Sequence, residues 1–284
     1  MKRKNYLLIL AFVSLFVLSC SEKKEETKPA TTATGSTPFT LPQRGSGSPD
    51  QMDMTQGLEQ KIAANPNSIE NLIEAANYYD VKKDFKNAVL YYKKVIALDK
   101  NFSEAHFNLG AIYTDLKDFK SAINSYKEVI RINPKDYEAM KLLGHVYYYS
   151  NQFKATIETL DRYLNNVPGD RESRLILAMA YEQNGQLEKS IENNKKVLAS
   201  DPKNVVALYN LGYILSTQKK WKEALGYFTQ VSAIDPQNHM VVYNLIVTYN
   251  ALGDMEKASQ EYTKLKKLNP KLAEQFADMF ETGN

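Results

Sequence analysis

The chain has 284 residues, with 36 lysine and arginine residues, 33 aspartate and glutamate residues and one cysteine. Three of the basic residues and none of the acidic ones lie in the first twenty positions, so the rest of the chain carries no net charge. A neutral chain with scattered lysines lacks the basic patch of nucleic-acid-binding proteins, so we expect no nucleic-acid partner. A single cysteine excludes an intramolecular disulfide.

The chain begins with a pattern typical of a secretory signal peptide. Lys2, Arg3 and Lys4 precede the uncharged run 6–18, YLLILAFVSLFVL, and small residues follow it. Crossing a bilayer takes roughly 20 apolar residues, whereas a run of about 10 to 14 is typical of a signal-peptide core. We therefore expect residues 1–19 to be a signal peptide, with a buried helix or a tail anchor as the alternatives.

The only cysteine directly follows this run, in the stretch VLSC of residues 17–20. The stretch resembles the lipobox of bacterial lipoproteins, in which the signal is cut just before a lipidated cysteine. The resemblance implies that Cys20 carries acyl chains such as palmitate, and that they anchor the protein to a membrane of the bacterial cell envelope. An ordinary signal peptide that leaves an idle thiol is the alternative.

The residue after the cysteine bears on which membrane is used. Ser21, rather than aspartate, resembles sorting to the outer membrane, facing the periplasm. The outer leaflet of the inner membrane and the cell surface stay open as alternatives. Residues 20–49 then hold the lipidated cysteine and a stretch rich in Ser, Thr, Pro, Gly, Lys and Glu. Such a composition predicts a disordered tether, and about 28 flexible residues would span roughly 30 Å.

From residue 66 onward the sequence repeats with a period of 34. Prolines stand at positions 66, 134, 168, 202, 236 and 270, and Lys100 fills the missing step. A period of this length predicts a solenoid of stacked repeats. With position 1 placed at Ile69, the units are 69–102, 103–136, 137–170, 171–204, 205–238 and 239–272.

Two columns of this register show how the repeat packs. Position 8, usually small, holds Ala76, Gly110, Gly144, Ala178, Gly212 and Ile246. Position 24, usually aromatic, holds Tyr92, Tyr126, Leu160, Asn194, Phe228 and Tyr262. Small residues let two helices approach closely, and the large side chains fill the space between them and the next unit. The departures, Lys100, Asn194 and Ile246, make three of the units looser matches.

The register resembles that of the tetratricopeptide repeat, a 34-residue helix–turn–helix family. The resemblance implies an all-α fold, a right-handed superhelical solenoid of six 34-residue repeats with a C-terminal capping helix. The lone Trp221 falls at position 17, where we expect it in the core at the turn between the two helices of its unit.

The segments that flank the repeats have the pattern of caps. Residues 50–68 are expected to form an N-terminal capping half-repeat, with Met54, Leu58 and Ile62 at helical spacing. Residues 271–284 are expected to form a C-terminal capping helix and tail. Its predicted apolar face consists of Leu272, Phe276, Met279 and Phe280. A detachable helix that docks into a partner is the alternative.

Nothing in the pattern indicates catalysis. His106, His145 and His239 lie in three different units, and none has a partner at metal-site or triad spacing. We therefore expect no metal, no cofactor and no catalytic residue, and the repeats leave no room for a catalytic domain. An enzyme is the least favoured reading.

Repeat solenoids bind partners along a concave surface. In the resembled family, positions 2, 5, 9, 12 and 13 of the first helix line that groove. The candidate groove residues are Glu70, Glu104, Glu138, Glu172, Lys141, Tyr209, Tyr213, Met240, Tyr243, Asn77, Asn108, Asn210 and Asn244. The glutamates also lie in the first turn of a helix, where a carboxylate complements the helix dipole. The tyrosines are the better candidates, because exposed aromatic side chains are favoured as binding anchors.

Some family members hold the terminal carboxylate of a partner in a clamp of lysine and asparagine. Asn77 and Asn108 fall at the two asparagine positions, but the basic positions are Ile73, Glu138 and Leu142. The clamp is broken, so we expect no binding of chaperone-tail carboxylates.

These patterns together predict a lipid-anchored interaction scaffold or adaptor of the bacterial envelope. Its partner would be an envelope protein, or a peptide segment of one, docked in the groove. Lipoproteins with this layout include assembly factors for pili and for outer-membrane proteins, and adaptors for cell-wall enzymes. A structural or self-associating envelope lipoprotein is the alternative.

Overall fold

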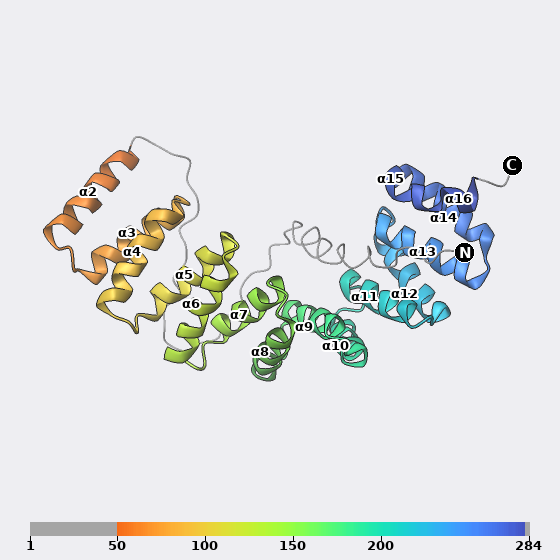
Figure 1. Ribbon diagram of the computed structural model, residues 1–284, viewed down its shortest axis with the longest axis horizontal. Helices are drawn as coiled ribbons and strands as arrows, with labels where there is room; N and C mark the ends of the chain where they lie inside the picture. The colour runs from red at the N-terminus through yellow and green to blue at the C-terminus, as the bar shows by residue number, and fades with distance from the viewer. Residues whose placement is uncertain (1–49, 282–284) are drawn as a thin grey trace. The chain divides into compact units, whose positions relative to one another are not determined.

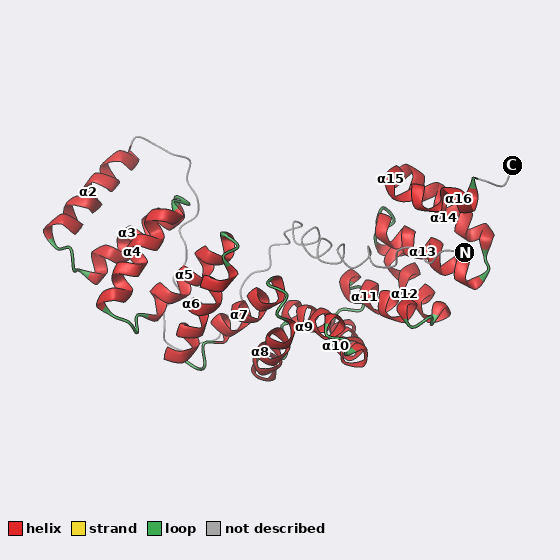
Figure 2. Cartoon of the chain, in the orientation of Figure 1, coloured by secondary structure: helices red, strands yellow, loops and turns green. Residues whose placement is uncertain are grey.

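The computed structural model describes the backbone of residues 50–281 and the side chains of residues 56–281. The predicted signal peptide, the lipidated Cys20, the tether and the last three residues of the predicted tail lie outside the described residues. Every regular element within the described range is helical, as Figure 2 shows. No helix in this range has the length and apolar character needed to span a membrane.

The helices follow one another in pairs joined by short turns, and the first and second members of a pair are called helix A and helix B (Figure 1). The A helices are α3 (Ile69–Val81), α5 (Ser103–Asp115), α7 (Tyr137–Tyr149), α9 (Arg171–Gln183), α11 (Val205–Thr217) and α13 (His239–Leu252). The B helices are α4 (Phe85–Leu98), α6 (Phe119–Ile132), α8 (Phe153–Asn166), α10 (Leu187–Ser200), α12 (Trp221–Ile234) and α14 (Met255–Leu268). The predicted all-α array of helix–turn–helix repeats is therefore confirmed.

Side-chain caps explain where these helices begin. At the start of α4, the Asp84 carboxylate accepts a hydrogen bond from the backbone N–H of Asn87 at 3.2 Å. Such a bond satisfies one of the N–H groups that lack a partner within the helix. The same cap is made by Ser68, Asp118, Asp136, Asp170, Asn204, Asn238 and Asp254. Most B helices end two residues before the recurring proline, whose ring cannot sit inside a helix.

The turn between helix A and helix B has the same backbone conformation in every described repeat. Position 15 has a left-handed φ of 58° to 80°, in Lys83, Lys117, Asn151, Gly185, Lys219 and Gly253. Only two of these residues are glycine, the residue that adopts this region without steric cost. The surrounding helix pair therefore imposes the conformation, whatever residue the sequence supplies.

The contact between positions 8 and 24 forms the centre of each pair. A Cβ atom added to Gly110 would lie 2.7 Å from the Tyr126 ring, and one added to Gly212 would lie 2.7 Å from the Phe228 ring. A Cβ atom on Gly144 would likewise overlap the Leu160 side chain. The glycines let the large side chain of helix B lie directly against the backbone of helix A, which confirms this part of the predicted packing.

Each pair also packs on the next one, so the core is shared between repeats. Helix α4 contacts α5, and the corresponding contact recurs between every B helix and the following A helix. The Tyr92 hydroxyl of the first repeat donates to Asn77 at 2.5 Å and accepts from Asn108 of the second repeat at 3.0 Å. Stability in such an array comes from these neighbour contacts.

The N-terminal flank forms α2 (Asp50–Ala64), in which Leu58 is buried and Ile62 packs against the first core cluster. The Lys61 ammonium forms an ion pair with Glu74 of α3 at 2.8 Å. The helix therefore contacts the first repeat from the side where a preceding B helix would lie. The side chain of Met54 lies outside the described side chains.

The C-terminal flank is not the single capping helix expected from the sequence. It divides into α15 (Pro270–Ala273), a 3₁₀ turn η2 (Glu274–Phe276) and α16 (Ala277–Phe280). Phe276 packs on Tyr243 of α13 at 4.9 Å, and Phe280 stacks on Tyr262 of α14 at 4.8 Å between ring centroids. The chain tightens at η2 because these two rings pack on different helices.

Two predicted core positions are wrong. Met279 is 43% exposed, because the break at η2 turns it away from the face that carries Phe276. Trp221 is half-buried rather than in the core. It is the first residue of α12 and directly follows two exposed lysines.

Candidate peptide-binding face

The A helices lie closer to one another than the B helices do. Helices α7 and α9, α9 and α11, and α11 and α13 contact each other, in addition to the contacts within pairs and between successive pairs. The A helices therefore line one side of the array, here called the inner face. It is the side on which the family resemblance places the binding groove.

The four predicted groove glutamates are exposed in the first turns of α3, α5, α7 and α9; they are Glu70, Glu104, Glu138 and Glu172. Glu138 forms an ion pair with Lys141, one turn further along α7, at 2.8 Å. Lys141 is therefore engaged within its own helix. An exposed ion pair of this kind contributes little stability, typically about 0–1 kcal/mol, so a partner could displace it.

The predicted tyrosine anchors differ in burial. Tyr209 is only 4% exposed and accepts a hydrogen bond from Asn244 at 3.1 Å, so the expectation that it is exposed is wrong. Its ring stacks on Tyr213 at 6.4 Å and leans on Phe228 at 6.1 Å, which makes it a support for the half-buried Tyr213. Tyr243 is half-buried beneath Phe276 of the C-terminal segment. Met240 is half-buried at the start of α13.

The predicted groove asparagines serve the fold. Asn77 and Asn108 both bond to Tyr92, and Asn210 donates to the buried Asn194 at 3.3 Å. Asn210 and Asn244 are both buried. Their amides are thus engaged in contacts between helices, and their role in binding a partner stays a prediction.

The structure adds Tyr148 of α7 and Met179 and Glu182 of α9 to the candidate set. Together with the predicted Tyr213 of α11 they lie on neighbouring A helices and are here called the central patch. The Tyr148 hydroxyl donates to the Met179 sulfur at 3.7 Å, and the charge of Glu182 raises the pKa of Tyr148 and Tyr213, after the larger effect of burial. Tyr148 and Glu182 are at position 12 of the register, which the family resemblance already places in the groove. Their burial cannot be seen in the sequence.

Glu182 is the acidic residue of the central patch, and its charge is not compensated. It is half-buried, and within the described part of the chain its carboxylate has no hydrogen-bond or ion-pair partner. Burial alone raises its pKa to about 7. Most charged side chains that are withdrawn from water are paired, because burial penalises the ionised form.

One group of polar residues resembles a catalytic constellation in composition only. His145 Nε2 lies 2.9 Å from the Ser173 hydroxyl, which donates to the Asp170 carboxylate at 2.9 Å. Ser173 is fully buried and Asp170 caps α9, so the group fixes the start of that helix and no substrate can reach the serine. Burial lowers the pKa of His145 to about 4, which keeps its ring neutral. The sequence did not indicate this contact, because its residues are 28 positions apart.

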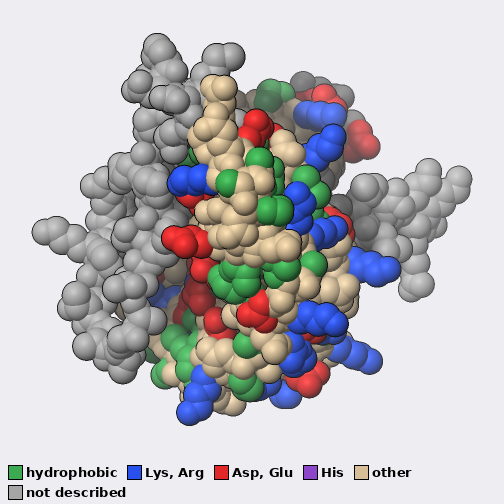
Figure 3. Space-filling view, turned by 90° about the vertical axis from the view of Figure 1, so that its left-hand side faces the viewer, with side chains coloured by type: hydrophobic (Ala, Val, Ile, Leu, Met, Phe, Trp, Pro, Cys, Tyr) green, Lys and Arg blue, Asp and Glu red, His purple; other side chains and the backbone are tan. Residues whose placement is uncertain are grey.

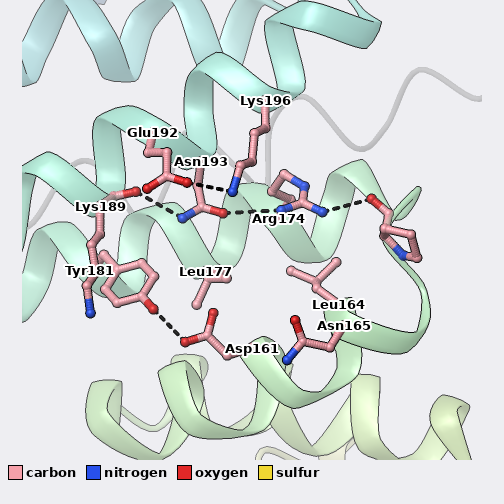
Figure 4. Close-up of a pocket in the computed structure, with 11 residues that line it drawn as sticks. Asp161, Leu164, Asn165, Arg174, Leu177, Tyr181, Lys189, Glu192, Asn193 and Lys196 are labelled. Carbon is pink, nitrogen blue, oxygen red and sulfur yellow. Dashed lines mark hydrogen bonds and ion pairs between the residues drawn. The ribbon is translucent and has the colours of Figure 1, made fainter.

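A separate hollow of about 450 Å³ lies between α8, α9 and α10 (Figure 4). Arg174 donates to the Pro168 carbonyl at 2.8 Å, and Lys196 pairs with Glu192 at 2.6 Å. Figure 4 shows the Tyr181 hydroxyl pointing at Asp161, to which it donates at 2.5 Å. These groups satisfy one another, so the hollow is lined by paired polar side chains.

Charges of both signs also mix elsewhere on the surface. On the face drawn in Figure 3, which shows the molecule from the α2 end, basic and acidic side chains are interspersed. Among the described residues, no group of three or more His, Cys, Asp and Glu side chains could hold a metal ion. The absence of a metal, a cofactor and a nucleic-acid partner stays a prediction.

The repeats match models of known families. Models described as tetratricopeptide repeat match residues 69–102, 103–136, 141–205, 194–226 and 215–278. The chain belongs to the tetratricopeptide repeat family, whose members are scaffolds for protein–protein interaction. No curated protein matches the sequence.

Solved structures share the fold over most of the chain. The C-terminal part of a tetratricopeptide-repeat protein from Cytophaga hutchinsonii has a TM-score of 0.67 and 15% identity, covering 79% of this chain and 93% of its own. PilW, described as a widely conserved type IV pilus biogenesis factor, has a TM-score of 0.59 and 18% identity, covering 73% and 97%. YrrB, described as having an unusual peptide-binding site, has a TM-score of 0.58 and 23% identity, covering 65% and 94%. At these identities, the similarity establishes the fold alone.

Proposed function

We propose that this chain is a lipid-anchored scaffold of the bacterial cell envelope that docks a segment of another envelope protein on its inner face. The observation that carries the proposal is the central patch, where half-buried Tyr148 and Tyr213 lie on the two A helices that contact α9, and the Glu182 carboxylate of α9 has no partner in the described chain. Aromatic side chains with partly accessible rings are favoured anchors in protein interfaces. Its role would be to help assemble or recruit an envelope complex.

The location rests on the N-terminal sequence. The stretch VLSC resembles a lipobox, and Ser21 after the cysteine resembles outer-membrane sorting. Two acyl chains hold a protein stably on a membrane, where one alone gives only marginal binding. The fold shared with a type IV pilus biogenesis factor is consistent with an assembly role at that membrane.

Docking on the inner face can be tested by photo-crosslinking in cells. A photoreactive phenylalanine analogue at Tyr213 or at the exposed Tyr149 of α7 should capture a partner protein, because both residues lie on A helices. The matched control is Leu90 on helix α4, which is 47% exposed on a B helix and should not capture it. Crosslinked products are identified by mass spectrometry.

The same experiment separates the proposal from its alternative. Tyr213→Ala, which removes a half-buried ring next to Tyr209, should abolish the products formed from position 149. Identical products from Leu90 and Tyr149 would show that capture does not depend on the inner face. A product with twice the mass of the chain would indicate self-association instead.

Lipidation is tested separately by changing the cysteine. Cys20→Ser should abolish incorporation of labelled palmitate and leave residues 1–19 attached, because the lipobox signal is cut only before a lipidated cysteine. Ser21→Asp is the control: it should keep the label, and in a host that sorts by this residue it should move the protein to the inner membrane. Palmitate incorporation into Cys20→Ser would refute the assignment of the anchor. The readouts are autoradiography and the intact mass of the protein.

A further inference from the structure

The Glu182 carboxylate lies in the last turn of α9, on the strip of the inner face where three A helices meet. Its charge raises the pKa of Tyr148 on α7, and of Tyr209 and Tyr213 on α11. The geometry agrees: the Tyr148 hydroxyl donates to Met179, one turn before Glu182 on α9, and α9 also contacts α11, which carries Tyr209 and Tyr213. All of these neighbours are uncharged at neutral pH.

No basic side chain of the neighbouring described helices compensates the charge. Lys141 on α7 forms an ion pair with Glu138, and His145 on the same helix is neutral and bonded to Ser173. Helix α11 contains no lysine, arginine or histidine at all.

Helix α10, the partner of α9 within the repeat, likewise leaves the carboxylate uncompensated. Its Lys189 lies over the Tyr181 ring at 5.2 Å, its Lys196 pairs with Glu192, and its Lys195 is exposed. On α8, which also packs on α9, Lys154 is exposed and Arg162 donates to the Pro134 carbonyl at 3.5 Å. Burial is accordingly the only influence on the pKa of Glu182, with no lowering by a nearby cation.

We propose that Glu182, with the rings of Tyr148 and Tyr213, forms a pocket for a lysine or arginine side chain of the docked partner. The inference rests on the proposed function and assigns the chemistry that the partner must present. An ammonium or guanidinium group would supply the missing positive charge, and the tyrosine rings would contact both the cation and its aliphatic stem. A neutral or acidic side chain would leave the carboxylate unpaired.

The pocket makes binding depend on pH in a stated direction. In the free protein the pKa of Glu182 is about 7, so the carboxylate is mostly ionised at pH 8 and mostly protonated at pH 6. The cationic side chain of the partner binds the ionised carboxylate, so its binding lowers the pKa of Glu182. The affinity for this side chain is therefore lost as the pH falls through 7. If only the ionised form binds, the dissociation constant should rise about tenfold from pH 8 to pH 6.

The test follows the ionisation of Glu182 itself by nuclear magnetic resonance. Glutamate in the full chain is labelled at the δ-carbon, and the resonance missing from Glu182→Gln identifies the residue. The probes are the N-acetyl methylamides of lysine, arginine and norleucine. The lysine or the arginine probe should lower the titration midpoint of Glu182 by about 1 unit or more, whereas the neutral norleucine probe should leave it unchanged.

A matched variant shows whether the effect belongs to the pocket. Glu188→Gln removes an equivalent charge from the exposed first turn of α10 in the same repeat and should leave probe binding unchanged. Glu182→Gln should abolish the response of the Tyr213 ring resonances to the lysine probe, with an unchanged far-ultraviolet circular dichroism spectrum. An equal loss of the response in both variants would show that the probe senses the overall negative charge of the surface, and it would refute the proposed pocket.

Two further outcomes would overturn the proposal. One is a titration midpoint of Glu182 that no probe shifts. The other is a midpoint near the ordinary glutamate value in the absence of any probe, because the charge of the carboxylate would then already be compensated within the free protein. Either result leaves partner capture from Tyr213 and Tyr149 standing. Conversely, a midpoint that the lysine probe lowers without any captured partner would refute the proposed function while keeping a pocket for basic side chains.

Discussion

Phe228→Ala is expected to lower the free energy of unfolding by about 3–5 kcal/mol, the usual cost of removing a buried aromatic side chain. Phe228 is fully buried in the core cluster shared by α11, α12 and α13. Its ring lies against Gly212 within the repeat and against Tyr209 of the inner face. The cavity would therefore weaken the helix pair and also remove the support of Tyr209.

The matched control is a second large aromatic residue of the same helix. Trp221 is half-buried at the first residue of α12, so Trp221→Ala should cost less than half as much as Phe228→Ala. Urea denaturation followed by far-ultraviolet circular dichroism measures both variants. Equal losses would contradict the burial of the two rings in this structure.

The second large effect is expected at the glycine that faces this ring. Gly212→Leu should lower the free energy of unfolding by about 3 kcal/mol, at the upper end of the usual cost of overpacking. Even the Cβ atom of the new side chain would lie 2.7 Å from the Phe228 ring, closer than real Cβ contacts. The helices would have to separate, which would also disturb the neighbouring repeats.

Gly226 provides the matched control for this substitution. It lies within α12, but a Cβ atom added there would meet nothing within 4 Å. Leucine is a better helix former than glycine, so Gly226→Leu should raise the free energy of unfolding by roughly 0.5–1 kcal/mol. A loss of stability at Gly226, or none at Gly212, would show that helix propensity rather than close approach of the helices governs these positions. The measurement is the same denaturation experiment.

The sequence predicted the fold well because the repeat presents each contact several times. Glycine or alanine at position 8 and a large side chain at position 24 recur in register, and the structure brings Gly110 onto Tyr126 and Gly212 onto Phe228. A single repeat would not distinguish such a contact from chance. Recurrence at a fixed spacing does, since neighbouring units must bury equivalent surfaces.

The candidate site was less predictable because burial depends on neighbouring repeats. Tyr209 was favoured as an exposed anchor, yet Asn244 from the following repeat bonds to it and Phe228 packs beside it. Glu182 occupies a position that is acidic or polar in most units, so its type alone gave no signal. Its distinguishing property is that its carboxylate has no hydrogen-bond or ion-pair partner among the described residues, which only the folded arrangement reveals.

The C-terminal segment shows a third limit of sequence patterns. Leu272, Phe276, Met279 and Phe280 have helical spacing, but their pattern does not require one continuous helix. Phe276 and Phe280 pack on different helices of the last repeat, and the chain tightens into the 3₁₀ turn η2 that ends at Phe276. Helical spacing of apolar residues predicts one continuous helix only where all of these residues pack against the same surface.

The half-buried position of the only tryptophan gives the molecule a local fluorescent reporter. Trp221 begins helix B of the fifth repeat, whereas far-ultraviolet circular dichroism averages over all the helices. In an array where each repeat contacts only its neighbours, distant repeats can unfold at different denaturant concentrations. The two signals therefore need not change together, and a gap between their transitions would show how far cooperativity extends from the fifth repeat along the chain.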